Sequence, residues 1–372
     1  MLISVANAAE AELVARLGAD IADLDDPRAG RPGEVPVETA RAAAFAVGSA
    51  CAISATLADP PFDIDAVAGR AEALTSAGVD FLRIAVDAHS LPALAPALRR
   101  FARRTKVIGM LFADKSPDLA LLQALAQAGF AGAMLDTWDK SRGRLLTHIG
   151  IAELSDFVAQ CRALRLAAGI AGSLEPPDIP RLRLVDPDVL GFRSAVRRGH
   201  DRNEEINPRT VSLVRDLIPR AGSASSSPPL QGLASGDGGD GRRGSGVEIV
   251  YVRDYLVSVD IGAYASERGA RQRVVFDVEA TVERAGDQAD DLRTIFSYDV
   301  ILDAIRLAIG RGHVNFIETL CDDVARRVLG DPRVSSVRVG VRKLDVIAGA
   351  VGVEIRRRRP SGAPDLSDSS PS

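Results

Sequence analysis

Four lysines stand out in this chain, because amine chemistry has few other places to occur. Of the 46 basic residues in the 372-residue sequence only Lys106, Lys115, Lys140 and Lys343 are lysines, and the other 42 are arginines. Arginine cannot form an imine with a carbonyl and hardly deprotonates, so a reaction that needs an amine must use a lysine. A codon bias towards arginine is the alternative, and it would leave these lysines without a special role.

Clustered carboxylates are the second chemical feature. The stretch DIADLDDPRAG, residues 20–30, places four aspartates and a proline in and after a short apolar run. Such a stretch can be a helix cap, a loop that binds a divalent metal, or the rim of an active site. The surrounding elements must decide between these three.

Residues 1–220 alternate short apolar runs with amphipathic segments. The expected strands are LISVA, ADIADL, CAISATL, FLRIAV, KVIGMLFA, GAMLDT, RLAAGIAG and VLGFRSA. Apolar spacing of three to four residues between them is typical of helices. Eight such units favour an α/β fold of the TIM (β/α)8 barrel type, although an open doubly wound sheet has the same periodicity.

A barrel collects its chemistry where strands end and the following loops begin. Those positions carry Asp25 and Asp26, Asp59, Asp87, Asp114 with Lys115, Asp136 with Lys140, Gly172-Ser173, and Gly191-Phe192-Arg193. The last two groups fit a phosphate site, since small residues expose backbone N–H groups beside an arginine. We therefore expect an acid- and amine-lined mouth over a phosphate site, while helix capping is the alternative for any single aspartate. Lys106 lies at the start of its strand and is expected to be structural.

Residues 221–246 are almost entirely Gly, Ser, Ala, Asp, Arg and Pro, which predicts a flexible linker, and a disordered tail is expected from 359 to 372. Between them, 247–358 read as a long hairpin, two amphipathic helices and a second hairpin. This ββααββ order predicts an α+β domain with both helices on one sheet face. Its other face must find a partner, so we expect a homo-oligomer formed through this domain.

Composition excludes several classes of protein. The formal net charge of −4 gives no case for nucleic-acid binding, and no apolar run approaches the length of a membrane helix. The N-terminus lacks the pattern of a signal peptide, so a cytoplasmic location is expected. Cys51, Cys161 and Cys321 have no ligand spacing, which argues against a disulfide framework or a zinc site.

A resemblance covers nearly all of residues 1–218. The segments ISVANAAEAELVARLGADIADL, AISATLADPP, AMLDT…K, AGIAGSL and GFRSA…GHDR are similar to the (5-formylfuran-3-yl)methyl phosphate synthase family. The resemblance implies a TIM barrel that joins two triose-phosphate molecules into a phosphorylated furan aldehyde, a methanofuran precursor. It also implies Schiff-base chemistry at a lysine, with Asp136 and Lys140 as acid/base or amine residues.

The barrel departs from that family at two amines. Where the family has a lysine after the second strand, in a motif ending in Pro, this chain reads DLDDP with Asp25 at that place. After the fourth strand the family's lysine is replaced by Arg83, which can hold an anion but cannot form an imine. Lys140, with Lys115 nearby, is left to supply the amine.

The C-terminal segment resembles dihydroneopterin aldolase over its whole length. The matching motifs are IGAYASERGARQRVVFDV, SYDVI, NFIETLCDDVARRVL, and VRVGVRK leading to GVEI, although KLDVIAGA lacks a proline that the family often has there. The resemblance implies a tunnelling-fold ring with sites between subunits. The implied reaction is retro-aldol cleavage of the dihydroneopterin side chain, giving hydroxymethyl-dihydropterin and glycolaldehyde.

Four residues match the aldolase pattern in order. The resemblance implies that Glu318 grips the pterin, Lys343 orders a water and moves the hydroxyl proton, Tyr298 protonates the enol carbon, and Glu267 lies near the lysine. His313 has no such match and is expected to serve only the connection between helices. The pterin ring is the electron sink, so no metal and no organic cofactor is expected.

Together these observations predict a cofactor-biosynthesis enzyme that handles a dihydropterin and a triose phosphate. The alternative for the barrel is a catalytically impaired scaffold or partner-binding module, because Asp25 and Arg83 replace two family lysines.

Overall fold

The computed structural model describes residues 1–25, 34–58, 60–101, 104–201, 203–218, 246–264, 267–284 and 291–359. The chain divides into two compact units, Met1–Gly222 and Ser223–Ser372. All of the predicted linker except Gly246, which begins a strand, and almost all of the predicted tail lie outside the described residues. Among the described residues, no helix is long and apolar enough to cross a membrane.

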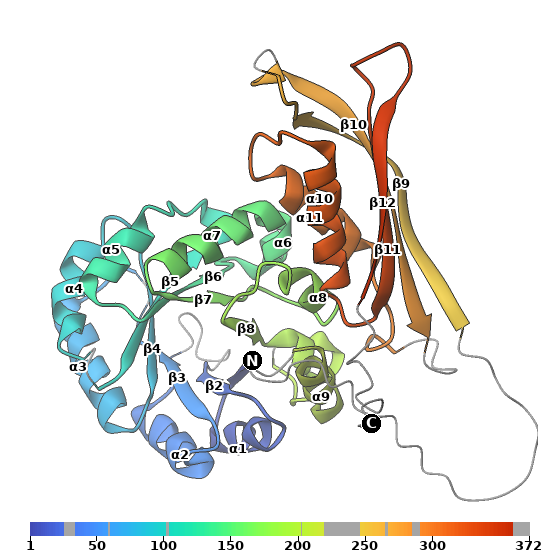
Figure 1. Ribbon diagram of the computed structural model, residues 1–372. Coiled ribbons are helices and arrows are strands. Elements are labelled where there is room, and N and C mark those ends of the chain that lie inside the picture. Colours follow the sequence, from blue (N-terminus) through green and yellow to red (C-terminus); the bar gives the residue numbers. More distant parts are fainter. Residues whose placement is uncertain are drawn as a thin grey trace, which may run out of the picture. The chain divides into compact units, whose positions relative to one another are not determined.

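The first unit is a closed barrel of eight parallel strands, which confirms the barrel and rules out the open sheet (Figure 1). Pairing of the first and last strands closes it, with Leu2 opposite Gly191 and Ile3 opposite Phe192. The strands are β1 (Leu2–Val5), β2 (Ile21–Leu24), β3 (Ala52–Thr56), β4 (Phe81–Ala85), β5 (Lys106–Phe112), β6 (Gly132–Asp136), β7 (Ala167–Ile170) and β8 (Val189–Phe192).

Helices surround the barrel strands and bury the apolar stripe that the three-to-four spacing predicted. The helices are α1 (Ala8–Arg16), α2 (Val37–Val47), α3 (Ile64–Ser76), α4 (Leu91–Arg99), α5 (Leu121–Ala128), α6 (Leu145–His148), α7 (Ile151–Ala163), α8 (Asp178–Leu182) and α9 (Pro208–Leu217). Short 3-10 turns follow several strands, namely η2 (Ala113–Lys115), η3 (Lys140–Arg142), η4 (Ser194–Val196) and η5 (Arg198–His200).

The second unit is a four-stranded antiparallel sheet with two helices, as the ββααββ pattern predicted. Its elements are β9 (Gly246–Asp260), β10 (Arg271–Arg284), α10 (Tyr298–Ile309), α11 (Ile317–Leu329), β11 (Val334–Lys343) and β12 (Val351–Arg358). The strand order is β12-β11-β10-β9, so the two hairpins meet at the β10–β11 pair.

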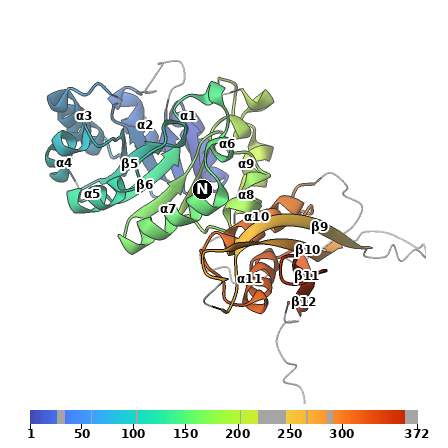
Figure 2. The ribbon, with the colours of Figure 1, turned by 90° about the horizontal axis from the view of Figure 1, so that it is seen from above.

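Both helices pack against one face of this sheet, as two perpendicular views show (Figures 1 and 2). The central strands supply the core, with Phe276, Val278, Val339 and Val341 all buried. The edge strand β9 instead leaves Val247, Ile249 and Tyr251 between 55% and 64% exposed.

Antiparallel pairing brings three chain segments together at one end of the sheet. The end of β9 pairs with the start of β10, with Asp260 opposite Arg271, and the end of β11 lies beside the same strand, with Lys343 opposite Val274. Residues far apart in sequence therefore meet around the loop between β9 and β10.

Candidate active sites

The barrel mouth holds a cavity of about 500 Å³ at the carboxyl ends of the strands. It brings together the five barrel residues predicted for chemistry and phosphate binding, namely Asp136, Lys140, Gly172, Ser173 and Arg193. Their positions agree with the rule that barrel chemistry gathers at this end. Their roles stay predictions.

Lys140 is anchored within its own loop. Asp136 ends β6, and Lys140 returns one turn later at the start of η3, which Asp139 caps by accepting from the Ser141 N–H. The Lys140 amine forms an ion pair with Asp136 and donates to the Thr137 carbonyl at 2.6 Å and to Thr137 Oγ1 at 3.0 Å. A carboxylate beside the amine can hold or receive its proton.

The loop after β7 is shaped for close approach to this pair. Gly172 has a φ of 113°, and a Cβ there would come within 3.3 Å of Asp136 Oδ1 and 3.2 Å of the Thr137 nitrogen. Ser173 follows in the left-handed region with a φ of 53°. Glycine suits position 172 because L side chains rarely adopt this φ and because a Cβ would be in tight contact with the aspartate and the backbone.

Arg193 and Asp25 form an ion pair at the mouth. Asp25 stands where the resembling family carries a lysine, so a carboxylate now meets the arginine predicted for phosphate. The arginine's charge is balanced internally before any anion arrives.

Arg83 was expected after the fourth strand, but it lies in the middle of β4 and is held inside the barrel. It is 7% exposed, lies 2.7 Å from Asp23 Oδ1 and donates to Thr56 Oγ1 at 2.9 Å. Ser4 donates to the other Asp23 oxygen at 3.2 Å. Arg83 was predicted to hold an anion, and the anion that it holds is the Asp23 carboxylate of this chain.

Strand polarity separates the aspartates of DIADLDDPRAG. Asp20 lies at the amino end and pairs with Arg215 at 2.8 Å, Asp23 points into the barrel, and Asp25 lies at the mouth. Asp26 is outside the described residues. In the whole described part of the chain, no cluster of three or more His, Cys, Asp or Glu residues could hold a metal ion.

Gly191 and Phe192 also line the mouth cavity, whereas Asp87, Asp114 and Lys115 do not. Lys115 lies over the Trp138 ring, 3.3 Å from its centroid, and Asp114 braces the same loop by accepting from the Trp138 and Asp139 N–H groups. Asp87 accepts from His89 and Ser90 ahead of α4, which is the helix-capping alternative. Asp59 lies outside the described residues.

Lys106 lies at the opposite end from the mouth. It begins β5, contacts the Phe81 ring and lines a separate cavity of about 270 Å³. This position agrees with a structural role for Lys106.

Asp23, His200 and Asp201 also line the mouth, and sequence reasoning missed them. Their positions in the sequence could have identified them. Asp23 faces inward on β2, and His200 follows β8 in a loop that a barrel must place at the mouth.

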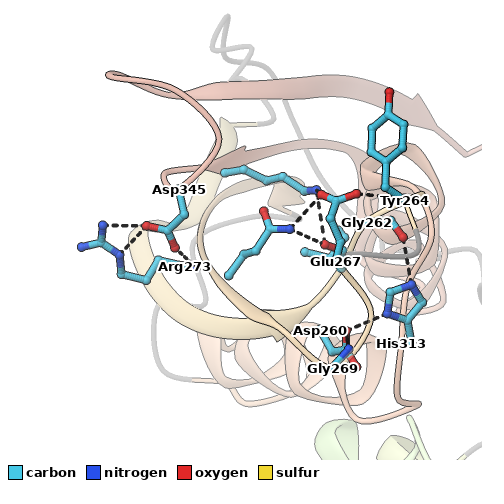
Figure 3. A network of polar contacts seen from close by, with 11 residues as sticks. Asp260, Gly262, Tyr264, Glu267, Gly269, Arg273, His313 and Asp345 are labelled. Atoms are coloured by element: carbon cyan, nitrogen blue, oxygen red, sulfur yellow. Dashed lines mark hydrogen bonds and ion pairs between the residues drawn. The ribbon is translucent and has the colours of Figure 1, made fainter.

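The second candidate site lies at the β9–β10 loop of the C-terminal unit (Figure 3). Lys343 is buried, and its amine is 3.2 Å from Glu267 Oε1 and 3.3 Å from the Ile261 carbonyl. The Gln272 amide donates to the same two oxygens at 2.9 and 2.7 Å. Glu267 was predicted to lie near Lys343, and the two side chains are in direct contact.

Glu267 is held in its ionised form. The Tyr264 backbone N–H donates to Oε2 at 3.0 Å, and together with Gln272 and Lys343 it lowers the pKa of this carboxyl to about 2. Gly262 makes room for the carboxylate, since a Cβ there would lie 2.1 Å from Glu267 Cδ. An anchored carboxylate beside a buried amine is suited to moving a proton.

Two residues matched to the aldolase pattern lie outside this cluster. Tyr298 opens α10 and is 58% exposed, and Glu318 is exposed in the first turn of α11. Within the described part of the chain, the side chain of Glu267 instead bonds to Tyr264, Gln272 and Lys343. Exposure leaves both side chains accessible to a substrate or a neighbouring subunit.

The loop after Lys343 is fastened by an ion pair that sequence reasoning missed. Asp345 accepts from the Arg273 backbone at 2.6 Å and from its guanidinium at 2.9 and 2.6 Å. This contact orders the start of the segment that lacks the family's proline.

The fold and the two sites define a fusion of a TIM-barrel domain with an α+β tunnelling-type domain. The family model for 4-HFC-P synthase matches residues 1–215, so the chain belongs to this family. The family model for dihydroneopterin aldolase matches residues 250–356.

Individual proteins are similar to one or the other part of the chain. A Methylorubrum extorquens protein provisionally named (5-formylfuran-3-yl)methyl phosphate synthase is 38% identical over 227 residues, covering 60% of this chain and 94% of the relative. The synthase of that name from Methanococcus maripaludis is 26% identical over 231 residues, covering 59% and 97%. A dihydroneopterin aldolase structure from Burkholderia thailendensis is 33% identical, covering 30% and 92%, with a TM-score of 0.28.

Proposed function

We propose that the C-terminal domain cleaves the side chain of 7,8-dihydroneopterin. The observation that carries this proposal is the Glu267–Lys343 cluster, a buried amine 3.2 Å from an ionised carboxylate in a domain matched by the aldolase family model. The cluster has the two groups that a proton transfer at a hydroxyl requires.

The reaction balances without an added reagent. Lys343 orders a water molecule, and through this water it takes the proton from the hydroxyl on the second side-chain carbon. The bond between the first and second side-chain carbons breaks, and its electrons enter the pterin ring. Glycolaldehyde leaves, and Tyr298 gives a proton to the first carbon, which yields hydroxymethyl-dihydropterin. The proton taken from the hydroxyl then passes through water to Tyr298 and restores the enzyme. Glu318 holds the pterin, since a carboxylate can accept two parallel N–H bonds.

The test is the release of glycolaldehyde from 7,8-dihydroneopterin. Wild type should release it, and Lys343→Ala should lower kcat by a factor of about 100 or more, as loss of a general acid/base does. Lys106→Ala is the matched control, because it also removes a lysine but at the amino end of the barrel. Absence of glycolaldehyde from wild type would refute the aldolase assignment.

A second function is favoured by the barrel mouth. Its cavity contains an amine, a carboxylate and an arginine among small-residue loops, which suits glyceraldehyde 3-phosphate. Lys140 supplies the amine for an imine, because Lys115 lies over Trp138 and does not line the cavity. The competing function is a scaffold, since Asp25 and Arg83 are both engaged in ion pairs.

Trapping separates these two functions. Incubation with glyceraldehyde 3-phosphate and borohydride should place a reduced adduct on Lys140, located by peptide mass spectrometry, and Lys140→Arg should remove it. Lys115→Arg should leave the adduct in place. If wild type gives neither an adduct nor a furan product, the scaffold function holds.

A further inference from the structure

His313 lies between two oxygen atoms of the β9–β10 loop (Figure 3). Its Nδ1 is 2.7 Å from Asp260 Oδ1 and its Nε2 is 2.9 Å from the Gly262 carbonyl oxygen. A carbonyl oxygen can only accept, and so can an ionised carboxylate, so both bonds require a proton on both ring nitrogens. A neutral imidazole can make only one of them.

The neighbouring charges agree with an imidazolium at this position. The hydrogen bond to Asp260 raises the pKa of His313 most, and the Gly262 carbonyl adds to this effect, whereas desolvation and, more weakly, Arg268 oppose it. The same bond lowers the pKa of Asp260, which also faces Arg271. The carboxylate therefore keeps its charge while the ring titrates.

The clamped loop is the one that carries the catalytic cluster. The Ile261 carbonyl, one peptide before Gly262, accepts from Lys343 and Gln272. Gly262 packs directly on Glu267, leaving no space for a Cβ. Loosening of the Gly262 carbonyl would therefore displace backbone that touches both Glu267 and Lys343.

The same contact fastens the segment that leads to Glu318. Val314 donates to the Asp260 carbonyl and accepts from the Gly262 N–H, both at 2.9 Å, in a short parallel bridge. Helix α11 begins three residues later at Ile317, with Glu318 in its first turn. His313 thus lies where the loop of Glu267 and the entry to α11 are joined.

We propose that His313 is a positioning residue that aligns the Glu267–Lys343 cluster with the start of α11, and that it does so only as its imidazolium. This role rests on the proposed aldolase function and extends it to a residue that touches neither substrate nor reacting atoms. The clamp is complete at low pH, and it loses one hydrogen bond as the pH rises through the raised pKa of His313.

The activity test compares full-length wild type with His313→Gln between pH 5 and 9. Glutamine can donate to one of the two oxygens and does not titrate. The ratio of wild-type to variant kcat for dihydroneopterin should be about 10 at low pH and fall towards 1 above the His313 titration. A ratio of 1 at every pH would overturn the proposal. His89→Gln, an exposed histidine of the barrel, should match wild type throughout.

A second measurement does not depend on catalysis. The chain has four histidines, so carbon-13 labelling of their rings allows each to be followed by NMR, with His313 identified from the spectrum of His313→Gln. Its titration midpoint should lie above the ordinary value of about 6.5 and drop by about 1 pH unit or more in Asp260→Asn. A midpoint at or below the ordinary value would overturn the proposal.

Hydrogen exchange of wild type links the titration to the loop. After correction for the intrinsic rate, peptides spanning 258–264 and 312–318 should exchange several-fold faster above the His313 midpoint than below it. Unchanged protection across the midpoint would contradict the clamp, even if His313→Gln fails to fold. If wild type releases no glycolaldehyde, the aldolase function fails, while the NMR and exchange results still decide the clamp.

Discussion

At the scale of single residues, the carboxylate at position 25 bears directly on phosphate binding at the barrel mouth. Asp25 pairs with Arg193, so the group predicted for phosphate is already engaged by a carboxylate of this chain. A substrate phosphate must displace Asp25 or share Arg193 with it. Lys140, in contact with Asp136, remains as the lysine that lines the cavity.

We expect Asp25→Asn to strengthen phosphate binding at the barrel mouth. Removing the negative charge weakens the Asp25 contact that competes with an anion for Arg193, so the dissociation constant for glyceraldehyde 3-phosphate should fall by a factor of about 3 to 10. Isothermal titration calorimetry at low ionic strength measures this change. Asp186→Asn removes the same charge near the start of β8, at the other end of the barrel, and should leave the constant unchanged. Equal or weaker binding by Asp25→Asn would show that Arg193 does not receive the phosphate.

At the scale of elements, strand pairing brings residues that are far apart in the sequence close together in space. The β9–β10 hairpin and the β11 end place Glu267, Gln272 and Lys343 at one sheet end, although 76 residues separate Glu267 from Lys343. Gly262 permits the close packing of that loop on Glu267, where a Cβ would overlap the carboxylate. In the barrel, parallel strands bring the ends of β6, β7 and β8 to one cavity for the same reason.

Element patterns were the most predictable part of this protein. The eight apolar runs and the ββααββ order correspond to the strands and helices of the structure, because periodicity follows from which faces are buried. The closed barrel was not distinguishable from an open sheet, since closure depends on the pairing of β1 with β8. His313 was predicted to be a mere connection, because nothing local signals that its partners are Asp260 and Gly262.

At the scale of the whole molecule, the exposed apolar residues of the C-terminal unit favour self-association. Val247, Ile249 and Tyr251 form a row on the edge strand β9, and Tyr264 and Phe316 are 75% and 58% exposed. An edge strand with free backbone groups and apolar side chains pairs readily with another copy. Tyr298, exposed at the start of α10, could then serve a neighbouring subunit's cluster.

We expect the full-length chain to form a homo-oligomer through the C-terminal domain. Light scattering after size-exclusion chromatography should give a multiple of the 39.3 kDa chain. The double variant Ile249→Lys/Tyr251→Lys should shift the mass towards one chain, because charged residues on an edge strand oppose pairing. Phe45→Lys, at an exposed apolar residue of the barrel, should leave the mass unchanged. A monomeric wild type would exclude this assembly.

The sequence by itself determined the two-domain composition, the strand and helix pattern, and the types of residue available for chemistry, above all the scarcity of lysine. These properties are local, because they follow from side-chain chemistry and from the periodicity of burial. The tertiary structure decided which of those residues meet. It separated Lys140, at the mouth, from Lys115, over Trp138, and from Lys106, at the amino end. It also placed the clustered aspartates 20, 23 and 25 in three separate environments, since Asp20 precedes β2, Asp23 lies within it and Asp25 follows it at the barrel mouth.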